Sequence, residues 1–368
     1  MLKLALVFGT RPEAIKMAPL VKQSAKMDQW ETKVIVTGQH REMLDQVLQI
    51  FEIEPDYDLE IMSHGQSLSE VTQRVLQGMD EIFENWKPDL VLVHGDTSTA
   101  FAAALAAFYR RIPVGHVEAG LRTRDVFNPF PEEANRRLVD AITTWYFAPT
   151  KEAKNNLLSE DVDESKIFVT GNTVIDALLE VVEEQYTFTT PELEALDFEK
   201  PIIVVTAHRR ENWGEPLEGI CEALLEISGM LSCKIVVAMH RNPSIQNVMK
   251  EFLSKDKQIV LIDAPNYKEF ANLLARSTIL LTDSGGLQEE APALNKPVLV
   301  MRTVTERPEA VQAGTVKLIG SSKDQIVQNV SALLTDQSLY EKMSASINPY
   351  GDGTAAQQIC DILNKIYK

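Results

Sequence analysis

The sequence predicts an α/β protein made of two doubly wound, Rossmann-like domains that face a cleft. Short β-branched segments alternate with longer amphipathic segments, in a βαβα order that occurs twice along the chain. Several short segments, such as LALVF, IIVV and VLVM, are apolar throughout, which is typical of parallel strands covered by helices on both faces. At ~150 residues per domain, the 368 residues suffice for about two domains.

The first series of strands is expected in short apolar segments that end at polar or turn-forming residues. These strands cover residues 3–8, 33–37, 89–93, 114–117, 145–148 and 167–170. Helices are expected in the longer segments 97–110 and 174–184, and after Pro131, because proline suits the first turn of a helix.

The second series follows the same rule, with strands at residues 202–206, 234–239, 258–262, 278–282, 297–301 and 316–319. Its helices are expected at residues 216–230, 268–275 and 323–334. Between residues 171 and 201 the helix expected at 174–184 is followed by TFTTPELEALDFEKP (187–201), a polar, proline-bearing stretch without strand character. We therefore place the boundary between the two domains between residues 171 and 201.

The composition excludes several classes of protein. Lys and Arg number 36 and Asp and Glu 53, so the formal net charge is −17 and long-range repulsion disfavours a nucleic-acid partner. The sequence has neither a run of ~18 apolar residues nor a signal-peptide pattern, so we expect a cytoplasmic protein with no membrane span. The cysteines are far apart and form no CxxC motif, which argues against disulfides or Cys-ligated zinc; they are Cys221, Cys233 and Cys360.

Charged residues of the first half gather where strands are expected to end, which is where open α/β sheets bind ligands. Asp96 follows one strand and Glu118 the next, while Glu132 and Glu133 follow Pro131. Taken singly, Asp96 could be a helix N-cap, and the glutamate pair could be favourable charges in a first helical turn. Taken together, the carboxylates indicate acid–base chemistry at one wall of the cleft.

Basic residues occupy other strand ends. Arg11 and Lys16 follow the first strand at the start of a helix, a place that favours anions. The alternative is an ordinary strand–helix turn with two solvated cations. In the second half, a histidine followed by two arginines predicts an anion site, with a solvated basic turn as the alternative. These residues are His208, Arg209 and Arg210, and His240 follows the next strand. The histidines without such neighbours are interpreted as structural or surface residues: His64, His94 and His116.

The segment TDSGGLQEE, residues 282–290, is the most informative of the second half. Ser284, Gly285 and Gly286 can offer backbone N–H groups to a phosphate at the start of a helix, without a Cβ in the way. Glu290 is placed to accept hydrogen bonds from two ribose hydroxyls, and Arg307 adds a cation after the next strand. The alternative is a glycine-rich turn with a capping serine.

With these motifs in order, the chain resembles the non-hydrolysing UDP-N-acetylglucosamine 2-epimerases of bacteria from about residue 3 to about residue 366. The resemblance implies a glycosyltransferase-B-like fold, a homodimer, and no metal or nicotinamide cofactor. The motifs that carry it are GTRPEAIKMAPL (9–20), HREMLDQVL (40–48), VLVHGDT (91–97), GHVEAGLRT (115–123), PEEANRR (131–137), FVTGNTVIDAL (168–178), VTAHRREN (205–212), TDSGGLQEEAP (282–292), PVLVMRTVTERPEAVQAGT (297–315) and NPYGDG (348–353).

The family's reaction interconverts UDP-GlcNAc and UDP-ManNAc, and the product feeds cell-surface polysaccharides. The resemblance implies that UDP is eliminated to give bound 2-acetamidoglucal and then adds back, with protonation of C2 from the other face. The resemblance also implies that a final helix returns to the first domain. The expected domains are therefore an N-terminal catalytic domain of residues 1–170 and 354–368, and a UDP-binding domain of residues 171–353.

By motif, the resemblance assigns residues to three roles. Asp96, Glu118, Glu132 and His208 match the catalytic positions. The UDP-sugar positions are matched by Arg11, Lys16, Ser284, Gly285, Gly286, Glu290 and Arg307. Positions for a second UDP-GlcNAc, an allosteric activator, are matched by Gln39, Glu133, Arg210 and His240, whereas Glu42 and Gly65 depart from that pattern.

Three alternative classes of protein would have sequence features that differ from those of this chain. A UDP-sugar-dependent glycosyltransferase of the same fold would need an acceptor groove and would not need three carboxylates near the sugar. A hydrolysing epimerase typically carries a fused kinase domain, for which 368 residues leave no room. A catalytically inactive UDP-sugar sensor would have lost the carboxylates, and all three are present.

Overall fold

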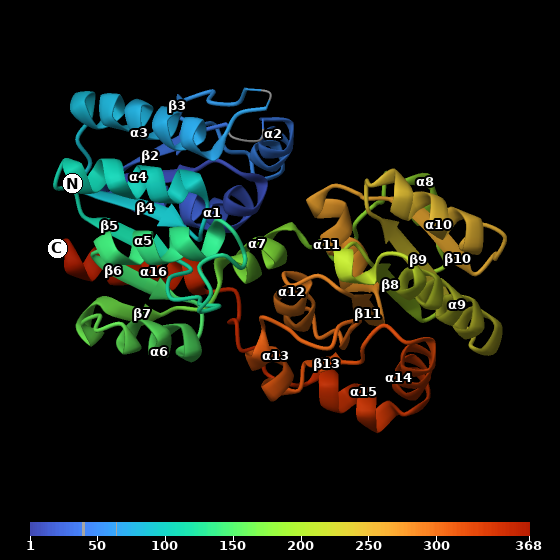
Figure 1. Cartoon of the computed structure of the whole chain (residues 1–368). Helices are drawn as coiled ribbons and strands as arrows, with labels where there is room; N and C mark the ends of the chain where they lie inside the picture. Colours follow the sequence, from blue (N-terminus) through green and yellow to red (C-terminus); the bar gives the residue numbers. More distant parts are fainter. Residues whose placement is uncertain (39–40, 64) are drawn as a thin grey trace. The chain divides into compact units, whose positions relative to one another are not determined.

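The computed structural model describes residues 1–38, 41–63 and 65–368. The chain forms two compact units (Figure 1). Unit 1 comprises Met1–Ala177 and Tyr350–Lys368, and unit 2 comprises Leu178–Pro349. The expected domain boundaries fall a few residues away from these, and the separate chemical tasks expected of the two domains stay a prediction.

Unit 1 is built on a seven-stranded parallel sheet with the strand order β3-β2-β1-β4-β5-β6-β7. The order reverses between β1 and β4, as it does in doubly wound folds. The strands are β1 (Leu2–Phe8), β2 (Trp30–Val36), β3 (Tyr57–Asp58), β4 (Leu90–His94), β5 (Val114–Val117), β6 (Trp145–Ala148) and β7 (Ile167–Val169).

Two rows of helices accompany this sheet. In one row α3 (Leu68–Asn85), α4 (Ser98–Tyr109) and α5 (Glu132–Ile142) are neighbours, and in the other α2 (Arg41–Ile50), α1 (Arg11–Ser24) and α16 (Ala355–Ile366). The alanines of α4 are buried, which lets α3 and α5 pack closely against it. The remaining helices are α6 (Lys151–Ser159), the short η1 (Glu164–Lys166) and α7 (Thr173–Val181), which runs from unit 1 into unit 2.

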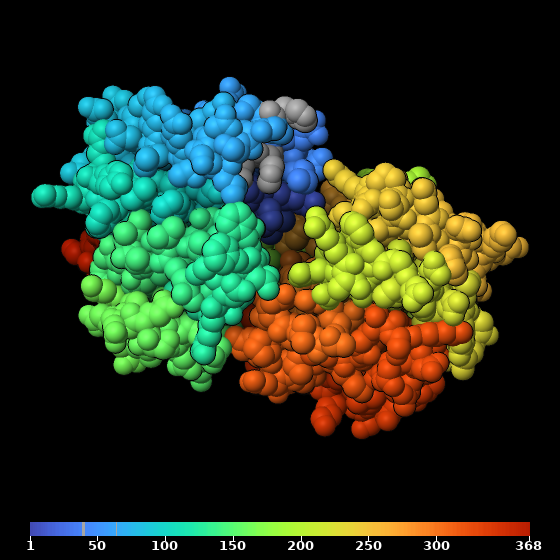
Figure 2. Space-filling view, viewed as in Figure 1, coloured from blue at the N-terminus to red at the C-terminus, as the bar shows by residue number. Residues whose placement is uncertain are grey.

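The last helix belongs to unit 1, as the red C-terminal segment shows in Figure 1 and again in Figure 2. Gln23 and Gln29 make hydrogen bonds to Gln357 and Asn364, at 2.8 and 2.5 Å. The backbone N–H groups at the start of α16 are capped by Asp176, whose carboxylate accepts from Ala355 and Ala356. Burial raises the pKa of Asp176 against the opposing effect of these two hydrogen bonds.

Unit 2 repeats the design with a six-stranded parallel sheet in the order β10-β9-β8-β11-β12-β13. The strands are β8 (Ile202–Thr206), β9 (Lys234–Met239), β10 (Ile259–Asp263), β11 (Ile279–Thr282), β12 (Val298–Val300) and β13 (Val316–Leu318). Its helices are α8 (Pro191–Glu194), η2 (Arg210–Asn212), α9 (Glu215–Met230), α10 (Pro243–Leu253), α11 (Tyr267–Arg276), α12 (Leu287–Ala293), α13 (Pro308–Ala313), α14 (Lys323–Thr335) and α15 (Gln337–Ser344).

The predicted α/β class with two doubly wound parallel sheets is confirmed. Every expected strand is present, with ends that differ by at most three residues. The expectation missed β3, whose two residues pair only at the edge of the sheet with Ile35 and Val36. The described residues contain no helix that is both long and apolar enough to cross a membrane.

Candidate functional site

A buried glutamate organises the turn between β1 and α1. Glu13 accepts hydrogen bonds from the backbone N–H groups of Gly9 and Thr10, at 3.0 and 2.8 Å, and so completes a capping box at the start of α1. Its other oxygen accepts from the Thr97 hydroxyl at 2.6 Å, which ties this turn to the one after β4. The candidate residues Arg11 and Asp96 lie on these two turns. Sequence reasoning missed Glu13, although the pattern Thr-x-x-Glu before an apolar run could have revealed it.

Burial raises the pKa of Glu13 from 4.5 to about 7, against the lowering effect of its hydrogen bonds. Between pH 4.5 and 7 the carboxyl group of Glu13 is therefore protonated in the folded protein, whereas it is ionised in the unfolded chain. The stability that Glu13 contributes is therefore largest below about pH 4.5 and declines as the pH rises through 7. We expect the difference in unfolding free energy between wild type and Glu13→Gln to fall by about 3 kcal/mol from pH 4.5 to 8, as measured by urea denaturation. A difference that does not vary with pH would contradict this assignment.

Glu118 lies directly after β5 and is buried among polar partners. One of its oxygens accepts hydrogen bonds from Lys16 and from Asn172, the latter at 2.7 Å. The other oxygen lies 3.7 Å from Nε2 of His94. Glu118 also has a positive φ of 66°, a conformation that costs a non-glycine residue about 1–2 kcal/mol. Strain of this kind gathers at functional sites, so the conformation supports a functional role for this carboxylate.

His94 is a buried neighbour of Glu118, although the sequence indicated no special surroundings for it. Burial lowers its pKa to about 3 and outweighs the attraction of Glu118, so the imidazole is neutral at pH 7. Its Nε2 makes no hydrogen bond within the described part of the chain. Asn172, which sequence reasoning also missed, follows β7 and holds the Glu118 carboxylate by its side-chain hydrogen bond.

Asp96 is held by helix α5 rather than used as a cap. Its carboxylate pairs with Arg136 at 2.5 Å, and its backbone carbonyl accepts from Asn135 at 2.8 Å. The N-cap of α4 is Thr97, whose hydroxyl accepts from the N–H of Ala100. The alternative of Asp96 as a cap is therefore wrong, and its carboxylate stays a candidate for chemistry.

The adjacent glutamates at the start of α5 have different surroundings. Glu133 is fully buried and accepts from the N–H groups of Thr123 and Arg124 and from Arg136 and Arg137, at 3.0–3.2 Å. Glu133 therefore anchors the loop before α5, and its contact with an activator stays a prediction. Glu132 is partly exposed, and its buried Oε2 makes no hydrogen bond to the residues that the structure describes.

A second buried histidine supports the turn that carries Asp96. His116 lies between Asp140, at 2.6 Å from Nδ1, and the carbonyl of Gly95, at 2.8 Å from Nε2. Arg122 pairs with the other oxygen of Asp140 at 2.7 Å. Burial would raise the pKa of Asp140, but His116 and Arg122 together hold it below its usual value. The structural interpretation of His116 fits its full burial, whereas His64 lies outside the described residues.

In unit 2, the segment after β8 is built around Asp283. One oxygen of this fully buried carboxylate accepts from the N–H groups of His208 and Arg209 and from Nδ2 of Asn212, at 2.8–3.0 Å. The ring of His208 is partly exposed and stacks on His240, with 5.7 Å between centroids and 19° between planes. The structure thus brings together the residue predicted to be catalytic and one predicted to bind an activator. Arg210 is exposed, and Gln39 lies outside the described residues.

The glycine turn follows β11 as expected. Gly286 is the N-cap of α12, and a methyl group on Gly285 or Gly286 would meet no atom nearer than 3.5 Å, on Arg209 and Glu290 respectively. Packing therefore does not require glycine here, and the close approach of a phosphate to this turn stays a prediction. The expectation for Ser284 needs correction, because its N–H already donates to Thr282 at 3.0 Å.

Arg307 and Glu290 lie on the segments that flank this turn. Arg307 pairs with Glu289, a buried residue whose backbone carbonyl accepts from Asn348 at 2.9 Å. Thr305 donates to Gln288 at 2.6 Å and so fixes the segment after β12 to α12. The predicted residues of each unit thus lie at the C-terminal edge of that unit's own sheet: Arg11, Lys16, Asp96 and Glu118 in unit 1, and His208, Ser284, Gly285, Gly286, Glu290 and Arg307 in unit 2.

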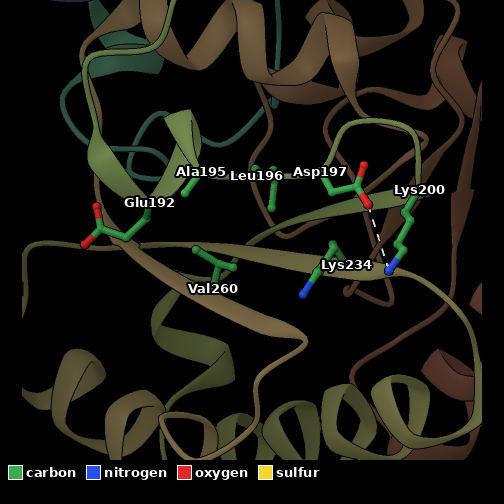
Figure 3. A pocket seen from close by; sticks show the side chains of 7 residues that line it. All are labelled: Glu192, Ala195, Leu196, Asp197, Lys200, Lys234 and Val260. Carbon is green, nitrogen blue, oxygen red and sulfur yellow. Dashed lines mark ion pairs between the residues drawn. The ribbon is translucent and has the colours of Figure 1, made fainter.

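A separate pocket of unit 2, of about 430 Å³, lies at the other edge of the sheet (Figure 3). Lys200 precedes β8, Lys234 begins β9, and Lys200 faces Asp197 at 3.9 Å. Ligands of open α/β sheets bind at the C-terminal edge, so we do not assign the candidate site to this pocket. Among the described residues, no three His, Cys, Asp or Glu side chains gather as a metal site would require.

Comparison with known proteins gives the family. A family model described as UDP-N-acetylglucosamine 2-epimerase matches residues 22–364. The chain is 53% identical over 371 residues to the UDP-N-acetylglucosamine 2-epimerase of Yersinia pestis, with 98% of each protein covered. The crystal structure of the Neisseria meningitidis UDP-GlcNAc 2-epimerase bound to UDP-GlcNAc aligns with a TM-score of 0.88 and 49% identity, over 99% of this chain and 100% of that one. The S. aureus MnaA–UDP structure aligns with a TM-score of 0.86 and 48% identity, over 100% and 97%. The chain therefore belongs to the UDP-N-acetylglucosamine 2-epimerase family.

Proposed function

We propose that this protein interconverts UDP-N-acetylglucosamine and UDP-N-acetylmannosamine by inverting C2 of the sugar. The family membership supports the substrate class, and relatives have been solved with UDP-GlcNAc and with UDP. The observation that carries the proposal is the strained, buried Glu118, which is held by Lys16 and Asn172 beside the neutral His94. Such a carboxylate is poised for proton transfer rather than for capping a helix.

The chemistry that we propose avoids direct removal of a C2 proton that no carbonyl activates. UDP leaves from the anomeric carbon and the C2 proton goes to a carboxylate, which gives bound 2-acetamidoglucal. UDP then adds back to the anomeric carbon, and C2 receives a proton on the opposite face. Asp96, Glu118 and Glu132 are the proposed proton-transfer groups.

The remaining residues would hold the nucleotide and stabilise the leaving diphosphate. Cations offset the charge that develops on the β-phosphate, a role that fits Arg11 and Lys16, and His208 would assist the departing phosphate through its imidazole. The turn of Ser284, Gly285 and Gly286 would accept the diphosphate, with Glu290 at the ribose and Arg307 beside it. Because the Ser284 N–H is already engaged with Thr282, its hydroxyl is the more suitable contact.

The decisive experiment is incubation of the protein with UDP-GlcNAc alone in D₂O. We expect UDP-ManNAc without free sugar, deuterium at C2 of the product, and movement of bridging ¹⁸O into non-bridging positions of the β-phosphate, all followed by NMR. Product that keeps its original C2 hydrogen, with no ¹⁸O scrambling, would overturn the elimination mechanism. A glycosyltransferase or an inactive sensor would form no UDP-ManNAc under these conditions.

Three further properties are part of the proposal. A homodimer would have a mass, measured by light scattering, of twice the 41.2 kDa of the chain. Activation by a second UDP-GlcNAc through Gln39, Glu133, Arg210 and His240 would appear as sigmoidal dependence of rate on substrate. UDP-ManNAc would supply the synthesis of cell-surface polysaccharides.

A further inference from the structure

Asp283 is a buried carboxylate that the proposed reaction does not use directly. It follows β11, and its Oδ2 accepts three hydrogen bonds from the segment after β8. Those donors are two backbone N–H groups and the Asn212 amide, so they anchor the segment that carries His208. This anchoring accounts for one of the two carboxylate oxygens.

The other oxygen faces the imidazole of His208. Asp283 Oδ1 lies 3.1 Å from Nδ1 of His208, and it is buried without a hydrogen bond from any described residue. A buried carboxylate oxygen without a donor destabilises the folded state. At 3.1 Å a proton on Nδ1 is attracted to this oxygen although the ring is not aligned for a hydrogen bond, whereas a lone pair on Nδ1 would face the carboxylate unfavourably.

We propose that Asp283 is a positioning residue that holds His208 in its Nδ1–H tautomer and thereby makes Nε2 the ring nitrogen that meets the β-phosphate. The inference rests on the proposed function, in which His208 assists the departing phosphate. Nε2 can then take up a proton and donate a hydrogen bond to a phosphate oxygen, while Asp283 stabilises the resulting imidazolium through Nδ1–H. The stacked ring of His240 restrains the tilt of the imidazole.

The groups that act on the charge of His208 are Asp283, His240 and Arg209. Burial lowers the pKa of His208, the Asp283 carboxylate opposes this, and His240 and Arg209 lower it further. Loss of the carboxylate charge would therefore lower the pKa of His208 again.

The test uses the Asp283→Asn variant of the full chain with ¹⁵N-labelled histidine. The asparagine oxygen can keep the three hydrogen bonds that anchor the segment, but its amide group then points N–H groups at Nδ1. We expect the ¹⁵N spectrum to show neutral His208 as the Nδ1–H tautomer in wild type and as the Nε2–H tautomer in the variant, with a lower pKa. The kcat should fall about 10- to 100-fold, with KM little changed.

Asn212→Ala is the matched control, because it removes a hydrogen bond to Asp283 Oδ2 and leaves Oδ1 facing His208. We expect this variant to keep the Nδ1–H tautomer. The same tautomer change in Asn212→Ala would show that Asp283 acts only through the shape of the segment, and would overturn the inference. The spectrum of His208→Gln assigns the His208 signal in wild type. A neutral Nε2–H tautomer of His208 in wild type would refute the inference even if Asp283→Asn did not fold. Absence of epimerase activity in wild type would refute the proposed function and leave the tautomer result standing.

Discussion

Replacing Glu118 with glutamine is expected to lower kcat for UDP-GlcNAc epimerisation by about 100-fold or more. Glutamine has the same shape and can still accept from Lys16 and Asn172, but it cannot take a proton from C2 at neutral pH. The affinity for UDP should change little, because the predicted nucleotide contacts lie mainly in unit 2. The measurement is steady-state kinetics together with UDP binding by calorimetry. Asp96→Asn and Glu132→Gln should fall in the same range.

Glu269→Gln is a matched control for the loss of a buried carboxylate. Glu269 is buried in unit 2 and accepts from the backbone N–H groups of Thr189 and Thr190, at 2.8 and 2.9 Å. We expect this variant to lose stability and to keep its kcat below its melting temperature. If Glu118→Gln retains near-normal turnover, then Glu118 only shapes the turn after β5.

The largest loss of stability is expected for Gly120→Ala. Gly120 has φ 86°, and an added Cβ would lie 2.3 Å from the carbonyl oxygen of Ala153 on α6. The left-handed conformation costs alanine about 1–2 kcal/mol, and the clash with backbone adds about 1–3 kcal/mol. We therefore expect the free energy of unfolding of unit 1 to fall by about 3 kcal/mol or more, as measured by urea denaturation.

Gly219→Ala provides the opposite expectation from the same chemical change. Gly219 lies within α9 and has no neighbour nearer than 3.9 Å to an added Cβ. Alanine is a better helix former than glycine, so this variant should gain about 0.5–1 kcal/mol. Equal free energies of unfolding of the two variants would contradict this expectation, because they would mean that the turn at Gly120 accepts a Cβ without loss of stability.

All strands of both sheets except the two-residue edge strand β3 could be predicted, because buried parallel strands are apolar throughout. The chemistry-bearing residues at their ends could be selected because the edge at which parallel strands end is known in advance. What the sequence does not contain is the long-range partner of each group. Thr97 and Asp96 are both suitable N-caps by type, and only the fold shows that Arg136, 40 residues away, engages the second.

The same limit explains the residues that were missed. Glu13 reaches Thr97 across 84 positions of sequence, Asn172 reaches Glu118 across 54, and Asp283 reaches His208 across 75. Each contact joins the ends of two strands that come together only when the sheet has formed: β1 and β4 are adjacent, as are β8 and β11, whereas β6 separates β5 from β7. A single sequence therefore indicates the candidate groups but not the side chains that orient them.

The return of α16 to unit 1 has a consequence for synthesis on the ribosome. Unit 2 is an insertion between Ala177 and Tyr350, so the apolar face of α1 emerges long before the helix that covers it. At about 5–20 residues per second, synthesis of residues 178–349 takes on the order of 10–35 s. During that interval the face of α1 that α16 will cover stays without its partner helix, so unit 1 can complete its packing only when translation ends.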